Sequence, residues 1–409
     1  MPIVVVGAGA AGLMAAIFAA AAGNRRVVLL ERTKDGGRKI LISGGGRCNV
    51  LPSALSPAQY FTASSTNTMR KMLLSWPLAG QRTFFEGDLR IPLALEPETG
   101  KLFPASNHAR DVRDALVDCA MRRGVSLQFE ALVRDIVPAG DFWRLTLADG
   151  AVIDAAAVII ASGGLSVPAT GSDGMGLRVA ERLGHTISET FPALTPLTAA
   201  SRPHAALAGI SLTVNLSTAL EKGRYETTGG FLFTHRGYSG PSVLNISHFA
   251  VRSQAAGQPQ PIFVQWTALD AAAWDQLLRE QGTTRLGTLI RRHLPVRVAD
   301  MLMREANVAG ERTLAELRRD ERTRIVYALT RYCLPWTGDE GYQKAEVTGG
   351  GVALGEVDSV TLESRKHPRL FFCGEVLDAF GPIGGYNFAW AFATGRSAGL
   401  GAARHARSS

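Results

Sequence analysis

A glycine-rich turn near the start of the chain constrains its fold more than any other feature. The β-branched run Ile3–Val6 leads into Gly7-Ala8-Gly9-Ala10-Ala11-Gly12, which fits the pattern GxGxxG, and an alanine-rich helix is expected to follow. The next apolar strand, Val27–Leu30, ends in Glu31. A strand, a glycine turn, a helix and a second strand ending in an acid, all within about 30 residues, predict the β-α-β unit of a dinucleotide-binding Rossmann-type fold.

Each position of this unit has a physical reason. Gly7 permits a tight turn, Gly9 lets the backbone approach a pyrophosphate, and Gly12 allows the helix to pack closely on the strand. The N-terminus of the helix offers free N–H groups and the positive end of its dipole to phosphate. Glu31 can accept hydrogen bonds from both ribose hydroxyls, and its charge repels a 2′-phosphate. The site therefore suits the ADP moiety of FAD or NAD rather than NADP.

Three further glycine-rich segments distinguish FAD from NAD. They are Ser43-Gly44-Gly45-Gly46-Arg47-Cys48-Asn49, Ser162-Gly163-Gly164 after a buried strand, and Gly374-Glu375 followed by Gly384-Gly385-Tyr386-Asn387 and a last helix. The Glu375 carboxylate can bind ribityl hydroxyls, and the N-terminus of the last helix can face the N1–C2=O edge of a flavin, which is negative after reduction. A simple NAD dehydrogenase needs no such return of the chain, so we favour non-covalently bound FAD.

The middle of the chain predicts an insertion into this domain. The sequence alternates with a period of two from about residue 191, reads as helices from about 271, and becomes glycine-rich again at 348–351. We therefore expect an α/β fold with a Rossmann-type FAD-binding domain of the glutathione-reductase-like, two-dinucleotide-binding class, made of residues 1–190 and 340–409. A β-rich subdomain (191–270) and a basic helical subdomain (271–339) would interrupt it.

Composition excludes several other classes of protein. The four cysteines are scattered, with no CxxC pair and no histidine at zinc-ligand spacing, so we expect reduced thiols in a cytoplasmic protein and no metal site. The apolar run Pro2–Gly23 follows no basic segment, and its glycines fall where a strand must turn into a helix. We therefore expect neither a signal peptide nor insertion into a membrane.

The net charge of +8 is unevenly distributed, because twelve arginines and seven acids lie between Arg279 and Arg331. A basic surface can bind nucleic acid or an anionic substrate. A solvated helical face explains the charge equally well.

Several separated motifs together resemble the YhiN/BaiN-like flavoproteins, which are bacterial FAD-binding proteins. These motifs are Ile42–Asn49, Phe233-Thr234-His235-Arg236-Gly237-Tyr238-Ser239-Gly240-Pro241, Gly374–Asp378 and Gly384–Asn387, and the resemblance covers nearly the whole chain. It implies an FAD domain interrupted by an insertion with a β part and a helical part. The residues that we expect around the cofactor are Gly7, Gly9, Ala11, Gly12, Glu31, Arg32, Ser43, Gly44, Gly45, Gly46, Arg47, Asn49, Val133, Ala161, Ser162, Gly163, Gly164, Gly374, Glu375, Gly384, Gly385, Tyr386, Asn387 and Phe388.

The family resemblance implies an oxidoreductase without defining its substrate, because its members differ in activity. We expect an NAD(P)H-driven reductase of an activated C=C bond, in which the flavin transfers hydride through N5 and the nicotinamide is only a transient donor. The alternatives are a ribosomal RNA uridine reductase (dihydrouridine synthase) whose basic helices hold phosphates, an aminoketone oxidase that produces peroxide, and a flavin-binding protein without turnover. The partner is accordingly a small molecule or rRNA, and nothing in the sequence indicates an oligomeric state.

Few residues are candidates for the chemistry itself. Arg47 is the preferred electrostatic anchor, since its loop is expected to reach the isoalloxazine, although it could equally bind the FAD pyrophosphate. His235 and Tyr238 lie in a glycine-flanked segment that could act as a lid. Cys48 and Cys373 have no CxxC partner and are interpreted as packing residues.

Overall fold

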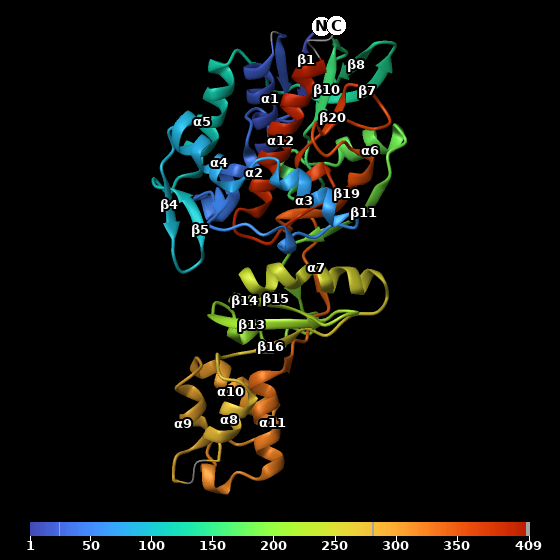
Figure 1. Cartoon of the computed structure of the whole chain (residues 1–409). Coiled ribbons are helices and arrows are strands. Elements are labelled where there is room, and N and C mark those ends of the chain that lie inside the picture. Colours follow the sequence, from blue (N-terminus) through green and yellow to red (C-terminus); the bar gives the residue numbers. More distant parts are fainter. Residues whose placement is uncertain (24, 280–281, 406–409) are drawn as a thin grey trace. The chain divides into compact units, whose positions relative to one another are not determined.

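The computed structural model describes residues 1–23, 25–279 and 282–405, and it consists of two compact units (Figure 1). Unit 1 is formed by Met1–Pro192 together with Glu346–Ser409, and unit 2 by Ala193–Ala345. The chain therefore leaves unit 1 and later returns to it. The observed limits at 192 and 345 lie two and six residues beyond those expected from the sequence.

Unit 1 is built on a five-stranded parallel sheet with the order β20-β10-β1-β2-β6. The three inner strands are continuous apolar runs and are completely buried, as expected for a parallel sheet covered on both faces. The strands are β1 (Ile3–Val6), β2 (Val27–Leu30), β6 (Ser126–Gln128), β10 (Ala157–Ile160) and β20 (Leu370–Phe372). Because β20 pairs with β10, the last part of the chain completes a sheet that begins at residue 3. The predicted Rossmann-type fold is confirmed.

Two helices from opposite ends of the chain lie side by side against this sheet (Figure 1). They are α1 (Ala10–Ala22) and α12 (Tyr386–His405). Their backbones touch at glycines of α12, because a Cβ added at Gly395 would lie 2.4 Å from the carbonyl oxygen of Ala11, and one at Gly399 would lie 2.2 Å from that of Ala15. Small residues on both helices therefore allow the close contact that joins the two ends of unit 1.

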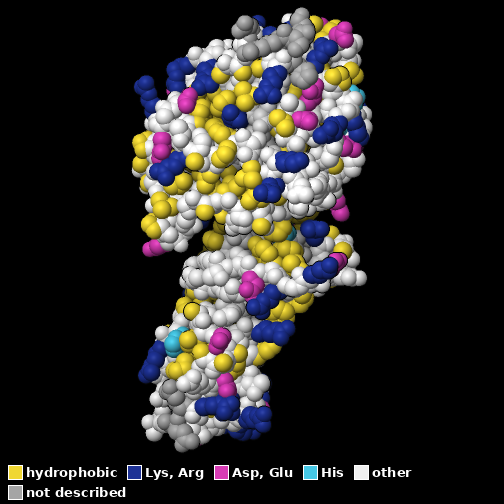
Figure 2. Space-filling model, viewed as in Figure 1, with side chains coloured by type: hydrophobic (Ala, Val, Ile, Leu, Met, Phe, Trp, Pro, Cys, Tyr) yellow, Lys and Arg dark blue, Asp and Glu magenta, His cyan; other side chains and the backbone are white. Residues whose placement is uncertain are grey.

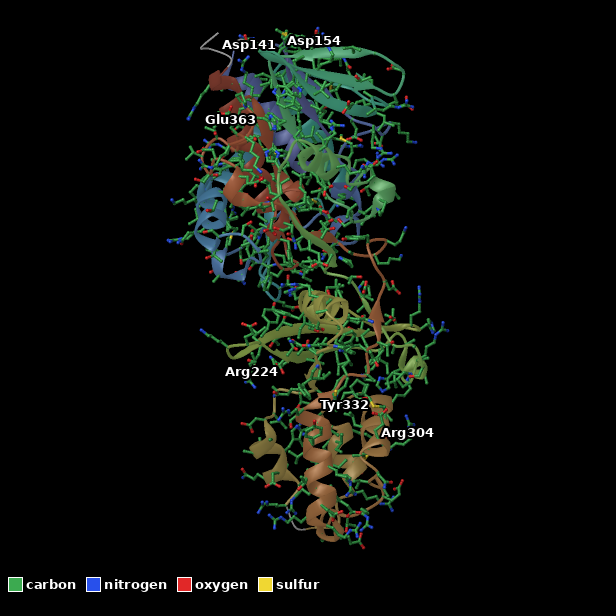
Figure 3. The ribbon with its side chains drawn as sticks, turned by 90° about the vertical axis from the view of Figure 1, so that its right-hand side faces the viewer. Asp141, Asp154, Arg224, Arg304, Tyr332 and Glu363 are labelled. Carbon is green, nitrogen blue, oxygen red and sulfur yellow. The ribbon has the colours of Figure 1, made fainter. Side chains whose placement is uncertain are left out.

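Smaller elements surround this core of unit 1. The remaining helices are α2 (Arg38–Ile42), α3 (Thr66–Leu74), α4 (Leu78–Thr83), α5 (Ala109–Arg122) and α6 (Met175–Arg182). The additional strands are β3 (Leu51–Pro52), β4 (Leu93–Glu96), β5 (Lys101–Pro104), β7 (Val133–Ala139), β8 (Phe142–Leu147), β9 (Val152–Ala155), β11 (Ile187–Ala193) and β19 (Val347–Val352). Figure 3 labels Asp141, in the turn between β7 and β8, and Asp154 on β9.

Unit 2 contains a seven-stranded antiparallel sheet with the order β17-β16-β13-β14-β15-β12-β18. Its strands are β12 (Leu197–Thr198), β13 (Ser211–Ala219), β14 (Arg224–Phe233), β15 (Gly237–Ser239), β16 (Phe263–Gln265), β17 (Tyr332–Cys333) and β18 (Gly338–Asp339). The helix α7 (Pro241–Ala255) packs against β13 and β14.

Four helices complete unit 2, namely α8 (Ala271–Leu277), α9 (Leu286–Arg291), α10 (Val296–Glu305) and α11 (Arg319–Thr330). They share one hydrophobic core with the sheet, so that Phe233 and Trp266 belong to the same cluster as Leu302. The segment 271–339, expected as a basic helical subdomain, also contributes two short strands at its end, because β17 and β18 return to the sheet. These strands have two residues each, which is too short for a period of two to be recognised.

Three observations bear on the class of the protein. None of the helices within the described ranges is both long enough and apolar enough to cross a membrane. No group of three or more His, Cys, Asp or Glu side chains there is arranged to hold a metal ion. The four cysteines are free thiols, of which Cys333 is exposed and Cys48, Cys119 and Cys373 are buried.

Candidate functional site

The glycine turn lies where β1, α1 and the end of β10 meet. Gly7 has a φ of 102°, which favours glycine, and a Cβ there would lie 2.7 Å from the carbonyl oxygen of Ala161. A Cβ at Gly12 would lie 1.8 Å from the carbonyl oxygen of Gly7. At Gly9, by contrast, a Cβ would meet no atom of the described residues within 4 Å. The packing of the protein therefore requires Gly7 and Gly12, whereas Gly9 borders open space at the N-terminus of α1.

Glu31 is fixed beside this turn. It is 8% exposed, and its Oε2 accepts a hydrogen bond of 2.8 Å from the backbone N–H of Ala8. Its Oε1 accepts bonds from the backbone N–H and the hydroxyl of Thr33, at 2.9 and 2.8 Å. Oε2 keeps room for a further donor, as a ribose hydroxyl requires.

Arg32 and Val133 are also expected at the cofactor from the sequence. The guanidinium of the neighbouring Arg32 is paired with Asp173. Val133, at the start of β7, is buried, and its contact with a cofactor stays a prediction.

The segment after β10 joins the first strand to the last part of the chain. The backbone N–H of Ala161 bonds to the carbonyl oxygen of Val6 at 2.9 Å. The hydroxyl of Ser162 is buried and has no hydrogen-bond partner among the described residues. Gly163 and Gly164 follow, and a Cβ at Gly164 would lie 3.0 Å from Glu375 Oε1. The sequence-predicted segments 161–164 and 374–375 are thus brought together.

Glu375 lies in a dense polar network. Its Oε2 accepts a bond of 2.8 Å from Lys39 Nζ, and its Oε1 accepts bonds from Ser166 Oγ at 2.6 Å and from Thr348 Oγ1 at 2.9 Å. Burial raises the pKa of this carboxyl, but the charge of Lys39 and the hydrogen bonds outweigh burial, so that the pKa is lowered overall. Gly374 packs against Ala11, since a Cβ there would lie 2.6 Å from the Ala11 Cβ. Glu375 is therefore an ionised carboxylate beside the start of α1.

Lys39, Ser166 and Thr348 were not expected at this site from the sequence. Lys39 is four residues before Ser43, and Thr348 immediately precedes a run of three glycines. Their closeness to glycine-rich segments is the sequence signal that could have placed them near the cofactor. Ser166 has no comparable signal beyond lying two residues after Gly164. These three residues meet Glu375 only in the folded protein.

The loop Ser43–Gly46 is an exposed turn whose backbone requires glycine. Gly44, Gly45 and Gly46 have φ values of 55°, 67° and 86°, three successive left-handed residues that other side chains would strain. Arg47 follows this turn, and its guanidinium lies 4.1 Å from the centroid of the Phe103 ring and 3.3 Å from Glu96 Oε1. Arg47 is therefore held by β4 and β5, and its role as an anchor for an electron acceptor stays a prediction.

Asn49 and the start of α12 form the other end of the site. Asn49 is 8% exposed, and its buried Oδ1 has no hydrogen-bond partner within the described part of the chain. A Cβ at Gly384 would lie 3.8 Å from Asn49 Nδ2 and 3.7 Å from Lys101 Cε. Gly385 lies directly on the backbone of Leu51, at 2.6 Å for an added Cβ. Asn49 thus lies next to the loop that begins α12.

The side chains that begin α12 are engaged within the protein. Asn387 Oδ1 accepts a 2.9 Å bond from the N–H of Gly381, and its Nδ2 donates to the carbonyl oxygen of the same residue at 3.0 Å. Phe388 stacks on Phe392, and the carbonyl oxygen of Tyr386 accepts a 2.6 Å bond from the hydroxyl of Tyr60. The backbone N–H groups of this first helical turn, rather than the side chains of Asn387 and Phe388, therefore remain the expected contacts to a cofactor.

A family model described as "HI0933-like protein Rossmann domain" matches residues 1–401. The chain belongs to this family. The ribosomal RNA dihydrouridine synthase of Escherichia coli is 33% identical over 403 residues, which are 96% of this chain and 95% of that protein. The 3-dehydro-bile acid delta(4,6)-reductase of Clostridium scindens is 30% identical over 408 residues, 98% of each chain. These relatives confirm the resemblance to the YhiN/BaiN-like flavoproteins.

Solved structures of the same fold include flavoenzymes. A flavocytochrome c3 fumarate reductase in an open conformation matches with a TM-score of 0.51 and 17% identity, over 99% of this chain and 78% of that chain. The 3-ketosteroid delta1-dehydrogenase of Sterolibacterium denitrificans matches with a TM-score of 0.51 and 13% identity, over 100% and 99%. Identity at this level shows the fold alone. The family and its relatives, together with this shared fold, show that the chain is an FAD-dependent oxidoreductase.

The residues of unit 1 fit FAD on two observations of this structure. The open space over Gly9 is what a pyrophosphate at the N-terminus of α1 requires. Ser162 Oγ and Asn49 Oδ1 are buried polar atoms without partners among the described residues, and such atoms cost about 1–3 kcal/mol each if nothing bonds to them. Both lie on segments that the sequence assigns to the cofactor.

The two candidates of unit 2 differ in exposure. His235 is exposed, whereas Tyr238 lies on β15 and is completely buried. The Tyr238 hydroxyl is 2.9 Å from His204 Nδ1, His204 Nε2 is 3.0 Å from Glu305 Oε1, and burial raises the pKa of the tyrosine. Tyr238 therefore lies in the core of unit 2 rather than in an open loop, and its catalytic role stays a prediction.

Proposed function

We propose that this protein reduces a C=C bond conjugated to a carbonyl group, with electrons supplied by NAD(P)H. The observation that carries the proposal is the pair of relatives that match over nearly their whole length. The names dihydrouridine synthase and delta(4,6)-reductase describe different substrates, yet both describe hydrogenation of a ring C=C bond. Because a fold alone does not define a reaction, it is the similarity to both relatives over nearly the whole chain that supports the same reaction class here.

The residues of unit 1 divide the binding of the cofactor among themselves. FAD, when bound, supplies hydride transfer. Gly9 and the first turn of α1 would hold its pyrophosphate, Glu31 its ribose hydroxyls, and Glu375 its ribityl hydroxyls. Asn49 Oδ1 would accept a hydrogen bond from an N–H or O–H group. The N-terminus of α12 would stabilise negative charge close to it through its dipole.

The nicotinamide donor is the first half of the proposal to test. The chain has one complete GxGxxG fingerprint, which supports a donor that binds only transiently. Anaerobic mixing with NADH or NADPH should bleach the flavin absorbance within the turnover time of the enzyme. If neither nucleotide reduces the flavin, the NAD(P)H-driven reaction is wrong. If an aminoketone reduces the flavin instead, and admission of oxygen then reoxidises the flavin with formation of peroxide, the protein is an oxidase.

A uridine in ribosomal RNA is the second candidate substrate. Relatives in Escherichia coli and Haemophilus influenzae, 33% and 29% identical, are both named ribosomal RNA dihydrouridine synthase. A pyrimidine would have to be unstacked to reach a flavin, as single-stranded loops allow. The test is to incubate the reduced enzyme with rRNA from a deletion strain and to measure dihydrouridine by mass spectrometry. No gain over a heat-treated enzyme would exclude this substrate.

The basic helices of unit 2 give this second candidate limited support. Most of the twelve arginines between 279 and 331 form ion pairs, and those without an acidic ion-pair partner in the described part of the chain are Arg292, Arg297, Arg304, Arg319 and Arg331. Figure 2 shows the Lys and Arg side chains spread over the visible face and mixed with acids. A phosphate-binding surface would therefore depend on these five arginines.

A further inference from the structure

A lysine, Lys39, is part of the network around Glu375. Lys39 Nζ donates to Glu375 Oε2 at 2.8 Å and also to Ser166 Oγ at 2.6 Å, and Ser166 Oγ donates in turn to Glu375 Oε1 at 2.6 Å. Lys39 comes from α2 and Glu375 from the segment after β20, 336 residues later. Their side chains are 25% and 18% exposed. A largely enclosed ion pair therefore connects the first and last parts of unit 1.

The two oxygens of Glu375 differ in the bonds that they accept. Oε1 accepts from Ser166 Oγ and from both the N–H and the hydroxyl of Thr348, at 2.6, 3.1 and 2.9 Å. Three donors occupy the acceptor capacity of one carboxylate oxygen. Oε2 accepts one bond, from Lys39. Oε2 is therefore the oxygen with room for a hydroxyl of a ligand.

Lys39 also determines the charge of this carboxylate. Burial raises the pKa of Glu375, and the attraction of Lys39 is the largest of the contributions that lower it. Without the ammonium, an enclosed carboxylate would take up a proton more readily. A protonated carboxyl would lose an acceptor site and offer a donor in its place.

We propose that Lys39 is a positioning residue for FAD, which keeps Glu375 ionised and oriented with Oε2 available to the ribityl hydroxyls. The proposal rests on the assignment of Glu375 to the cofactor site under the proposed function. Lys39 acts through Glu375 and has no part in the transfer of hydride. Because Lys39 keeps Glu375 ionised, the affinity for FAD should stay nearly constant across neutral pH. Without Lys39, the affinity should fall as the Glu375 carboxyl takes up a proton.

The test measures FAD affinity as a function of pH. Apoprotein of the wild type and of the variants Lys39→Met, Lys39→Arg and Glu375→Gln is titrated by quenching of FAD fluorescence between about pH 6 and pH 8. Lys71→Met is the matched control, because Lys71 is an exposed lysine on α3. Circular dichroism of each apoprotein checks that it is folded.

We expect the Kd of the wild type, Lys39→Arg and Lys71→Met to change little with pH. In Lys39→Met, the Kd should rise by up to about tenfold per unit as the pH falls, because one proton must leave before FAD binds. Glu375→Gln should bind FAD weakly at every pH, and the double variant with Lys39→Met should be no weaker. If Lys39→Met does not fold, Lys39→Gln tests the same loss of charge with a polar side chain.

Several results would overturn the proposal in distinguishable ways. If the Kd of Lys39→Met for FAD depends on pH as that of the wild type does, or if a pH dependence persists in the double variant, Lys39 does not act through Glu375. Either result would leave the cofactor site itself unchallenged. Failure of the wild type itself to bind FAD would overturn the cofactor site and the role of Lys39 with it. A role of Lys39 that is only structural would weaken binding equally at every pH.

Discussion

Two glycines of the same turn should respond in opposite ways to substitution by alanine. Gly9 has φ −76° and ψ −175°, a conformation that alanine adopts without strain, and its added Cβ would meet no described atom within 4 Å. At Gly12 the added Cβ would lie 1.8 Å from the carbonyl oxygen of Gly7, whereas ordinary contact begins at 3.4 Å, so the backbones must separate by about 1.6 Å. Gly9→Ala should therefore affect the ligand, and Gly12→Ala should affect the fold.

The expected magnitudes differ enough to separate the two effects. Overpacking costs about 1–3 kcal/mol, and alanine recovers about 1 kcal/mol of helix propensity, so Gly12→Ala should destabilise the apoprotein by up to about 2 kcal/mol, the upper end applying because the clash is severe. Gly9→Ala should cost the apoprotein less than about 1 kcal/mol as a change of N-cap. A Cβ that displaces the pyrophosphate from two charge-assisted hydrogen bonds should cost at least about 3 kcal/mol of binding, which is roughly 150-fold in Kd.

The assay combines urea unfolding of the apoproteins with FAD titration of each. Gly87→Ala serves as the control, because a Cβ at Gly87 also meets no described atom but lies away from the turn. If Gly9→Ala bound FAD as tightly as the wild type, the open space over Gly9 would not be the place of the pyrophosphate, and the assignment would be refuted. Unfolding of the two variants at the same urea concentration would equally contradict the difference expected between Gly9 and Gly12.

Three further predictions concern stability and RNA. Gly399→Ala should lower the free energy of unfolding by about 1–2 kcal/mol in urea, because its Cβ would lie 2.2 Å from the carbonyl oxygen of Ala15. Gly355→Ala should not lower it, because a Cβ there has no described atom within 4 Å. Burial, followed by Arg252, lowers the pKa of His248 from 6.5 to about 3, so the unfolded state binds the extra proton as the pH falls. The wild type should therefore lose about 2 kcal/mol more than His248→Leu between about pH 7 and pH 5, and equal losses would contradict this. If rRNA is the substrate, replacing Arg292 and Arg319 by alanine should make RNA binding less sensitive to salt. The slope of the logarithm of the RNA association constant against the logarithm of the salt concentration should be reduced by about 0.7 for each phosphate that is no longer neutralised. Replacing the ion-paired Arg291 should change this slope less.

Local pattern was sufficient for the frame of unit 1. The apolar runs of β1 and β2, the glycine turn between them and Glu31 after β2 are close in sequence, so spacing and residue type predict their arrangement. The return of the chain after the insertion was also predictable, because the glycine-rich segments near residues 350, 374 and 384 repeat the character of the first domain. The predicted Rossmann-type fold is confirmed for these reasons.

Contacts between distant residues were decided only by the tertiary structure. No local pattern relates Lys39 to Glu375, and none shows that Tyr238 is enclosed by the core of unit 2 or that Arg47 is held by Glu96. Sequence patterns report the period of one element, whereas the partner of a charged or polar side chain depends on which elements fold against each other. The chain itself determines where a dinucleotide can bind, and the folded packing determines which carboxylates and cations remain free to act on it.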